Sequence, residues 1–376
     1  MKSLLAIIFH GPSGESAVEQ LMSSARRSAA EDLIASLTDR GIPALLVTPE
    51  SEAGRFHPSI DVSTTPDGSF HFGQSLQGLI RARSPQGLLV FGSGSGALLG
   101  PTDLEALAQF ALKGQPGAVF NNFYSSDLAA IAEPEALLTI ELPPSDNALG
   151  FALADAGLPC RTMRRNAETQ FDIDTPTDLH VLKASERGGA KLQALLRDLE
   201  FPHPTLPAIL QKMTERAALL MFIGRLSPRT WADIEGQIAC RTHGLIEGRG
   251  MRSSGIAHSP LLSTLLREEG PGRFVRRLAS SCDAAIVDSR PLLAENGLLP
   301  CPADRFSSDL FAPDSIQDPL WREFTEAAAE APVPILLGGH SVLSGGLYLM
   351  GEACWKDRSL ERRLHPDLFE PDKEPS

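Results

Sequence analysis

In the first half of the chain, the hydrophobic and polar positions follow two different patterns, and segments of one kind take turns with segments of the other. Short apolar runs at Leu4–Phe9 and 87–91 are typical of buried strands, and glycine follows each within two residues. Over 15–37 and Phe72–Arg83, apolar residues recur every three or four positions, which is the spacing of an amphipathic helix. Alternating strands and helices predict an α/β fold with a mostly parallel sheet. Further strands are expected at 43–47, 118–120 and 136–142.

The second half begins after glycine-rich and proline-rich stretches between residues 185 and 205, which predict a domain boundary. Helices are expected to start at Ser227-Pro228, Ser259-Pro260 and Gly270-Pro271. Strand-like runs follow at Ala284–Asp288, 333–337 and 347–350, and the glycine-rich loop 338–346 could join the last two as a hairpin. We therefore predict a domain over 1–185, a linker over 186–205, a smaller mixed α/β domain over 206–362 and a polar tail over 363–376.

Composition bounds the class of protein. The chain has 376 residues, of which 42% are hydrophobic and 22% charged, so it is long enough for two cores of ordinary globular character. The net charge is −13, and a duplex-binding surface needs clustered cations, which argues against nucleic acid as a partner.

The environment can also be predicted. Five scattered cysteines without a CxxC pair predict neither a zinc site nor a disulfide framework, which favours a reducing compartment. The chain has no apolar run of membrane-spanning length and no signal-peptide pattern. We expect a cytoplasmic protein that does not use a membrane as partner.

The segment FDIDTPTDL at 171–179 is the most informative stretch. If it ends a strand, Asp172 and Asp174 lie on one face, and a pair of carboxylates suits Mg²⁺. A second interpretation is equally concrete: Thr175 caps a helix, Pro176 takes its first position, and Asp178 completes a capping box. The residues by themselves leave both interpretations open.

Two loops could accompany this segment. The first, at 10–15, follows the first strand, and the backbone N–H groups at the start of the next helix could hold a phosphate. The second is the Gly/Ser loop 92–96, where glycines allow close approach and Ser93 and Ser95 could bind phosphate or ribose. A flexible turn explains the second loop equally well. Because ligands bind at the carboxyl edge of such sheets, we expect both loops and the aspartate pair to converge there.

Four motifs in this order resemble the nucleotidyltransferases of the glycosyltransferase-A fold: GQSL at 73–76, LLVFGSGSGALLGPTDL at 88–104, DNAL at 146–149 and FDIDTPTDL at 171–179. Similar groups are the molybdenum-cofactor guanylyltransferases, the 2-phospho-L-lactate guanylyltransferases and the bacterial glycosyltransferase-A-like proteins. The resemblance covers roughly residues 1–185. It implies a three-layer sandwich and Mg²⁺-dependent transfer of a nucleotide from a nucleoside triphosphate, or use of a nucleotide-sugar, with a small phosphorylated or sugar-like acceptor.

The resemblance also implies roles for individual residues. Asp174, helped by Asp172, would be the catalytic and metal-binding pair. Asn147 corresponds to a position near the acceptor, although an asparagine here also suits an Asx turn. The remaining nucleotide contacts would come from Gly11, Ser13, Gly14, Ser93 and Ser95.

The sequence departs from the family pattern at two places. The first loop carries Glu15 and no lysine, and Arg26 and Arg27 lie about three turns further along the predicted helix. The family's metal-binding aspartate after the central strand falls on Gly94 or Ser95. Two alternatives therefore stay open: a catalytically degenerate nucleotide-binding or assembly module, and chemistry that resides in the second half.

The second half contains a dense set of arginines and one notable loop. The arginines could form an anion pocket, but neighbouring glutamates favour a solvated charged face. His340 and Ser341 lie in a glycine-bracketed loop that could close over a ligand, and His258 precedes a predicted helix start. Trp231, Ile234 and Ile238 have helical spacing and are expected in a core. The arginines are Arg241, Arg249, Arg252, Arg273, Arg276 and Arg277.

Overall fold

The computed structural model describes residues 3–68, 70–247, 261–294, 300–356 and 358–364. The first half of the chain forms one seven-stranded sheet, in which apolar runs supply β1, β2, β4, β5 and β6, whereas β3 and β7 are largely polar. The strand order is β3-β2-β1-β4-β6-β5-β7, and β6 alone runs antiparallel to its neighbours, so the predicted mostly parallel sheet is confirmed. The strands are β1 (Leu4–Phe9), β2 (Ala44–Pro49), β3 (Asp61–Thr65), β4 (Gly87–Gly92), β5 (Gly117–Phe120), β6 (Leu128–Ala132) and β7 (Cys160–Thr162).

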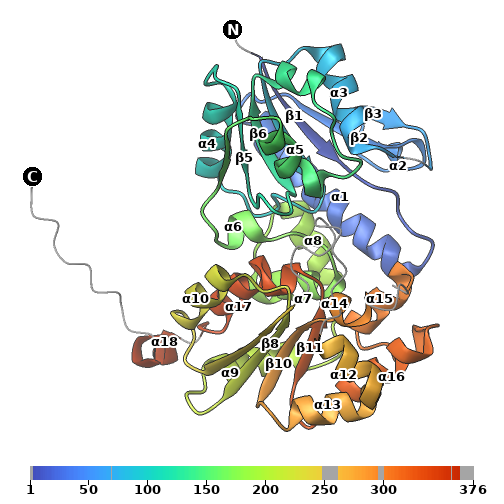
Figure 1. Cartoon of the computed structure of the whole chain (residues 1–376), viewed down its shortest axis with the longest axis vertical. Coiled ribbons are helices and arrows are strands. Elements are labelled where there is room, and N and C mark those ends of the chain that lie inside the picture. The colour runs from blue at the N-terminus through green and yellow to red at the C-terminus, as the bar shows by residue number, and fades with distance from the viewer. Residues whose placement is uncertain (1–2, 69, 248–260, 295–299, 357, 365–376) are drawn as a thin grey trace, which may run out of the picture.

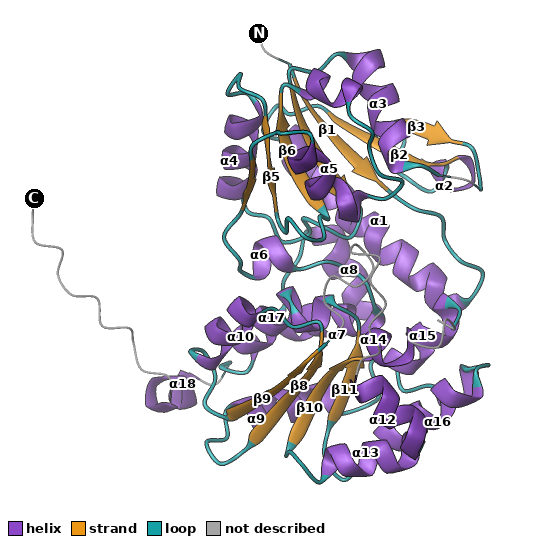
Figure 2. Cartoon of the chain, in the orientation of Figure 1, coloured by secondary structure: helices purple, strands orange, loops and turns teal. Residues whose placement is uncertain are grey.

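Helices cover both faces of this sheet, which makes the expected three-layer sandwich (Figure 2). Successive strand side chains point to opposite faces, so Ile8 belongs to one core and Ile7 to the other. One core packs against α1 (Ala17–Thr38) and α4 (Pro101–Ala111). The other core packs against α3 (Phe72–Arg83) and α5 (Leu149–Asp155).

A second sheet of four parallel strands, ordered β11-β10-β8-β9, lies below the first in Figure 1. Its strands are β8 (Leu219–Gly224), β9 (Arg241–Ile246), β10 (Ala284–Asp288) and β11 (Ile335–Gly338). Strands buried on both faces are apolar throughout, as the run LLMFIG of β8 shows. The expected second α/β unit is thus present.

Helices also cover both faces of the four-stranded sheet. One face packs against α7 (Pro176–Ser185), α9 (Thr205–Met213) and α17 (Gly345–Ala353). The other packs against α12 (Leu261–Glu269), α13 (Pro271–Ala279) and α16 (Pro319–Ala329). The remaining helices are α2 (Glu50–Ala53), α6 (Ala167–Gln170), α8 (Ala190–Asp198), α10 (Pro228–Glu235), α14 (Ser289–Ala294), α15 (Pro302–Asp309) and α18 (Arg358–Leu364), with 3-10 turns η1 (Pro134–Thr139), η2 (Asp146–Ala148), η3 (Pro313–Ser315) and η4 (Ser341–Leu343).

Helix α1 ties the two sheets together. Its first turns place Met22 and Ala25 in the core of the four-stranded sheet, and its later turns place Leu33 and Leu37 in the core of the seven-stranded sheet. One continuous helix thus contributes to both cores, which fixes the position of one sheet relative to the other.

Three predicted strands are wrong. Residues 136–142 overlap η1 instead, and residues 347–350 lie inside α17. Every residue of helix α17 except Glu352 is buried, so its sequence is almost wholly apolar and shows no helical periodicity. The predicted hairpin is therefore absent, because η4 and α17 occupy its place. Residues 171–174 form only an isolated bridge between Asp172 and Ser95 rather than a strand.

The predicted linker over 186–205 contains a helix, α8, whose residues Leu192 and Leu196 belong to the large core around the four-stranded sheet. The domain limits themselves stay a prediction. Ser259-Pro260, His258, Arg249 and Arg252 lie outside the described residues, as does most of the expected tail.

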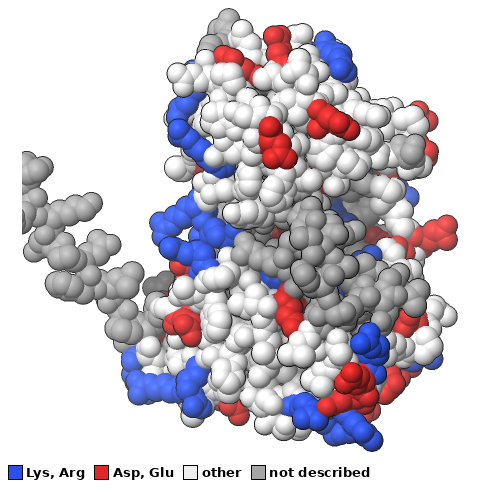
Figure 3. Space-filling model, viewed as in Figure 1, with Lys and Arg blue, Asp and Glu red and all other residues white. Residues whose placement is uncertain are grey.

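The structure also shows the state of the cysteines and of the charged surface. All five cysteines are free, in agreement with the absence of a disulfide framework. Arg277 forms an exposed ion pair with Glu269, and Figure 3 shows acidic and basic side chains side by side at the bottom of the view, as expected of a solvated charged face. None of the helices formed by the described residues combines the length and the apolar character that crossing a bilayer needs.

Candidate functional site

The carboxyl ends of the two sheets face a common cavity of about 1000 Å³. From the seven-stranded sheet, the loops after β1 and β4 line it with Gly11, Gly14, Ser93 and Gly94. From the four-stranded sheet, the residues after each of β8, β10 and β11 line the opposite side. These are Arg225, Arg290, Gly339, His340 and Ser341. The loops therefore converge as predicted, and a second wall joins them.

Four aspartates line the cavity: Asp127, Asp146, Asp172 and Asp174. Burial raises the pKa of Asp127 to about 7, and the negative charge of Asp174 acts in the same direction. Burial, then the charges of Asp174 and Asp127, raise the pKa of Asp172 well above its usual range. Carboxylates that repel one another in a buried place are stabilised in their ionised form by a cation. The cavity wall on this side therefore favours a positively charged ligand.

The aspartate pair lies on a segment that is held from several directions. Arg26 donates from Nε to the Ile173 carbonyl (2.7 Å) and from Nη2 to the Asp174 carbonyl (2.9 Å). The Ile173 N–H donates to the Gly94 carbonyl (3.2 Å), and the Ser341 hydroxyl donates to the Asp172 carbonyl (2.6 Å). Arg26 thus reaches the site despite its distance along α1, where it positions the chain that carries the two carboxylates.

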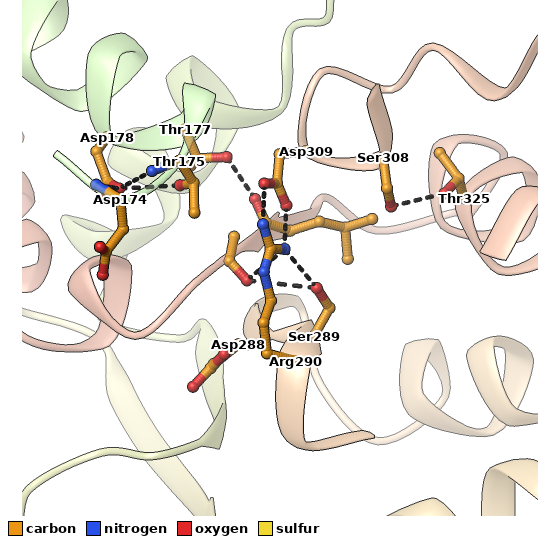
Figure 4. Close-up of polar contacts among 12 residues, drawn as sticks. Asp174, Thr175, Thr177, Asp178, Asp288, Ser289, Arg290, Ser308, Asp309 and Thr325 are labelled. Atoms are coloured by element: carbon orange, nitrogen blue, oxygen red, sulfur yellow. Dashed lines mark hydrogen bonds and ion pairs between the residues drawn. The ribbon is translucent and has the colours of Figure 1, made fainter. Parts of the chain in front are cut away.

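The capped-helix interpretation of this segment is confirmed. One oxygen of Asp178, Oδ2, accepts from the N–H (2.7 Å) and the hydroxyl (2.9 Å) of Thr175, and from the Asp174 N–H (3.0 Å). Figure 4 shows the Asp174 carboxyl group directed away from this network. The two interpretations therefore do not compete, because Asp178 caps α7 while Asp172 and Asp174 line the cavity.

Two of the predicted binding residues use their hydroxyls inside the fold. Ser13 donates both its N–H (3.2 Å) and its hydroxyl (2.5 Å) to the buried carboxylate of Glu52. The hydroxyl of Ser95 donates to the carbonyls of Gly92 (2.9 Å) and Asp127 (2.8 Å). Neither serine lines the cavity, so the structure does not support a ligand contact by either hydroxyl.

The other predicted residues do reach the cavity. Gly11, Gly14, Ser93 and Asn147 line it together with the two aspartates. The side chain of Asn147 is already held, because Oδ1 accepts from Ser125 (2.6 Å) and Nδ2 donates to Asp146 (3.3 Å). Their binding roles stay predictions.

A buried histidine stands beside Ser93. The Nδ1 atom of His10 lies 3.0 Å from the Ser93 hydroxyl, and Nε2 lies 3.3 Å from the Ser23 hydroxyl. Burial lowers the pKa of His10 to about 4, so its ring is neutral at pH 7. His10 therefore cannot replace the basic residue that the family pattern places in this loop.

Gly94, one of the two positions where the resemblance implies an aspartate, lies against the side chain of Asp172. A Cβ atom at this position would lie 2.5 Å from Oδ1 of Asp172, closer than real Cβ atoms approach. Asp172 therefore occupies the space that a side chain at position 94 would need. Asp127 supplies a further carboxylate nearby, and sequence reasoning missed it because the stretch around it, NNFYSSDLAA, matches no motif.

Buried ion pairs organise the opposite wall. The Asp288 carboxylate accepts from Nε (2.6 Å) and Nη2 (3.1 Å) of Arg225, and the Asp309 carboxylate accepts two bonds from Arg290 (2.6 and 2.5 Å). Arg290 also donates to the Gly338 carbonyl at the end of β11. Figure 4 shows the Arg290 guanidinium group directed toward Asp309. Sequence reasoning missed both arginines, since each follows a strand without any recognisable motif.

Three carboxylates of the cavity, those of Asp127, Asp172 and Asp174, are oxygen ligands that magnesium could use. Within the described part of the chain, no group of three His, Cys, Asp or Glu side chains is arranged to hold a metal ion. Magnesium does not require one, because it usually keeps several waters and binds one or two carboxylates together with substrate phosphates. Asp172 and Asp174, with Asp127 beside them, fit that kind of partly open site.

Comparisons with known proteins concern the fold of about half of the chain. No protein-family model and no curated protein matches the sequence. Solved structures that resemble it include a nucleotidyl transferase from Methanothermobacter (15% identity, TM-score 0.39, covering 53% of this chain and 100% of that one). A cytidylyltransferase from Leptospira borgpetersenii (14%, TM-score 0.37, 52% and 93%) and a 4-diphosphocytidyl-2C-methyl-D-erythritol synthase from Anaerococcus prevotii (13%, TM-score 0.33, 47% and 92%) are also similar. At these scores the likeness carries no argument about chemistry.

Proposed function

We propose that this chain is a divergent nucleotidyltransferase-like enzyme that binds a nucleoside triphosphate together with Mg²⁺ in the cavity between the two sheets. One observation carries the proposal. Asp127, Asp172 and Asp174 gather at the carboxyl edge of a mostly parallel sheet, in a cavity large enough for a nucleotide and an acceptor. Buried carboxylates with raised pKa values in a cleft are a recognised sign of a functional site.

Each part of the cavity wall would have its own task. Asp174 and Asp172 would hold the magnesium ion, which when bound neutralises charge on the phosphates. The loop with Gly11 and Gly14, which opens α1 and carries no side chain at these two positions, would take the triphosphate. Arg26 keeps the aspartate segment in place through its two carbonyl contacts.

The reaction itself is a substitution at phosphorus. An oxygen of the acceptor attacks the α-phosphorus of the nucleotide and forms a new P–O bond. The P–O bond to the β-phosphate breaks, and pyrophosphate leaves with the electron pair of that bond. The cavity would contribute by holding the reacting groups close to one another.

Isothermal titration of the full chain with GTP, CTP, ATP and UTP, each with and without Mg²⁺, tests the proposal. We expect one of them to bind with Mg²⁺, and Asp174→Asn to weaken that binding roughly tenfold or more because a charged ligand is lost. Asp155→Asn, an exposed carboxylate on α5, is the matched control and should change nothing. If none of the four triphosphates binds, the proposal fails.

A non-catalytic nucleotide-binding or assembly module is the second candidate. It is favoured by the loop after β1, where His10 is neutral at pH 7 because burial lowers its pKa to about 4, and where no lysine is present to bind a triphosphate. In that case Asp174→Ala would leave the function of the protein in the cell intact. Loss of function in a strain that carries only Asp174→Ala would exclude it.

A further inference from the structure

The wall of the cavity that comes from the four-stranded sheet has no role in the function proposed above. It consists of the residues that follow β8, β10 and β11, and it faces the aspartates across the cavity. The nucleotidyltransferase resemblance stops near residue 185, so it assigns nothing to this wall. Two of its side chains have unused hydrogen-bonding capacity.

Arg225 is the first of these side chains. Its Nε and Nη2 atoms donate to Asp288, which is fully buried and anchors the guanidinium group from one side. Gly224 makes this approach possible, because its φ is +120° and a Cβ there would lie 2.7 Å from the Asp288 side chain. An arginine has five N–H donors. The side of the guanidinium group that carries Nη1 therefore keeps a second pair of N–H donors for another ligand. Within the described residues, Nη1 has no hydrogen-bond partner, and Arg225 lines the cavity with 26% of its side chain exposed.

His340 is the second side chain with unused hydrogen-bonding capacity. It lies two residues after β11, next to Ser341, and lines the same cavity. Its Nδ1 atom is buried and finds no hydrogen-bond partner in the described part of the chain. A buried polar atom without a partner costs free energy, so its presence beside an open cavity indicates a ligand that completes it.

Arg290 differs from Arg225 in this respect. Its guanidinium group donates to Asp309, Ser289 and the Gly338 carbonyl, and only 11% of its side chain is exposed. Arg290 therefore stiffens the wall, whereas Arg225 presents donors to the cavity. A guanidinium fork suits the two oxygens of a phosphate or carboxylate group.

We propose that this wall is an acceptor subsite for an oxyanion: the end of the Arg225 guanidinium group binds a phosphate or carboxylate of the acceptor, and Nδ1 of His340 hydrogen-bonds the same acceptor. The acceptor part of this inference rests on the proposed function, because it takes the nucleotide to be on the opposite wall. The transfer would then occur between two ligands held by different sheets. An acceptor without an oxyanion would lose its main contact.

The experiment uses the full chain without nucleotide or Mg²⁺, titrated with inorganic phosphate and, separately, with malonate at constant ionic strength. Arg225→Gln alone leaves Asp288 buried and unpaired, so the main variant is Arg225→Gln with Asp288→Asn, which removes both charges together. The matched control is Arg229→Gln, four residues further on, whose side chain is 71% exposed. We expect the double variant to weaken anion binding roughly tenfold or more and Arg229→Gln to leave it unchanged.

The two anions identify the group that the subsite takes. Binding of phosphate alone indicates a phosphorylated acceptor, and binding of malonate alone indicates a carboxylate acceptor. His340→Phe should also weaken binding, whereas His340→Asn, which keeps a polar atom near the position of Nδ1, should restore part of it. The inference is overturned if neither anion binds, or if the double variant binds both as well as the natural protein does.

A last measurement separates this inference from the proposed function. Asp174→Asn should leave phosphate binding unchanged or stronger, since it removes negative charge from the opposite wall. If a nucleotide bound with Mg²⁺ displaces the phosphate completely, the subsite belongs to the triphosphate and the acceptor assignment is wrong. If no nucleotide binds but Arg225-dependent anion binding persists, the proposed function fails while the oxyanion site stands.

Discussion

Ser341, which follows β11, and Asp172, which lines the opposite wall, are joined by two hydrogen bonds. The Ser341 hydroxyl donates to the Asp172 carbonyl (2.6 Å) and accepts from the Asp172 N–H (3.3 Å), although the residues are 169 positions apart. The hydroxyl therefore satisfies both backbone groups of Asp172. This contact sets one wall of the cavity against the other, so the site depends on both sheets.

Removal of the Ser341 hydroxyl should weaken the contact between the two walls of the cavity. For Ser341→Ala we expect a loss of about 1–3 kcal/mol in the free energy of unfolding, because two backbone groups lose their partner in a buried place. Urea unfolding measures it. Ser280→Ala, at an exposed position after α13, is the control and should stay within about 0.5 kcal/mol. Equal effects of the two substitutions would show that the contact between Ser341 and Asp172 does not contribute to the stability of the fold.

Asp178 should make stability depend on pH. Burial raises the pKa of its carboxyl group to about 8 in the folded chain, from an ordinary value of 3.8. The folded state therefore binds one more proton than the unfolded state between these pH values, and its stability falls as the pH rises from about 4 to about 8. The largest slope for one proton is about 1.4 kcal/mol per pH unit.

Asp178→Asn tests this dependence. The variant is less stable at low pH, since an amide replaces the cap, but its stability should fall less between pH 4.5 and 8 than that of the natural protein. Unfolding in urea at several pH values gives both profiles. Parallel profiles would mean that Asp178 does not titrate in this range.

The buried pair of Arg290 and Asp309 should be sensitive to the loss of one partner. Asp309→Ala leaves the Arg290 charge unpaired in the interior, and we expect a loss of about 3–5 kcal/mol of stability. The exposed pair of Arg83 and Asp61 is the comparison, and Asp61→Asn should change stability by less than about 1 kcal/mol. Thermal and urea unfolding measure both. A loss near that of Asp61→Asn would contradict the assignment of a structural role to Arg290.

Gly94 should not tolerate a side chain. Gly94→Ala places a Cβ atom against Oδ1 of Asp172, so this aspartate must move, and we expect lower stability and weaker Mg²⁺–nucleotide binding together. Gly94→Asp, which places an aspartate at one of the two positions where the resemblance implies one, should be at least as harmful. Gly78→Ala, a helical glycine in α3 with open space around it, is the control and should be neutral or slightly stabilising. Improved binding by Gly94→Asp would show that the contact with Asp172 does not exclude a side chain at this position.

Local patterns predicted much of the first sheet. The ranges Leu4–Phe9 and Phe72–Arg83 are found as predicted, because a buried strand and an amphipathic helix each leave a regular apolar pattern. The apolar pattern did not identify elements at two extremes, an almost fully buried helix and a largely exposed edge strand. Helix α17 is apolar except at Glu352, and its residues 347–350 resemble a buried strand. Strand β9 is exposed at the sheet edge and has too few apolar residues to be recognised.

The sequence by itself determined the α/β class, the capping box of α7 and the two cavity aspartates, because each depends on residues close together in the chain. Only the tertiary structure decided what surrounds them. Asp127, Arg26, Arg225 and His340 come from distant segments and join Asp172 and Asp174 through long-range packing, which no local spacing encodes. The same packing gives the hydroxyls of Ser13 and Ser95 acceptors within the fold, and neither serine lines the cavity.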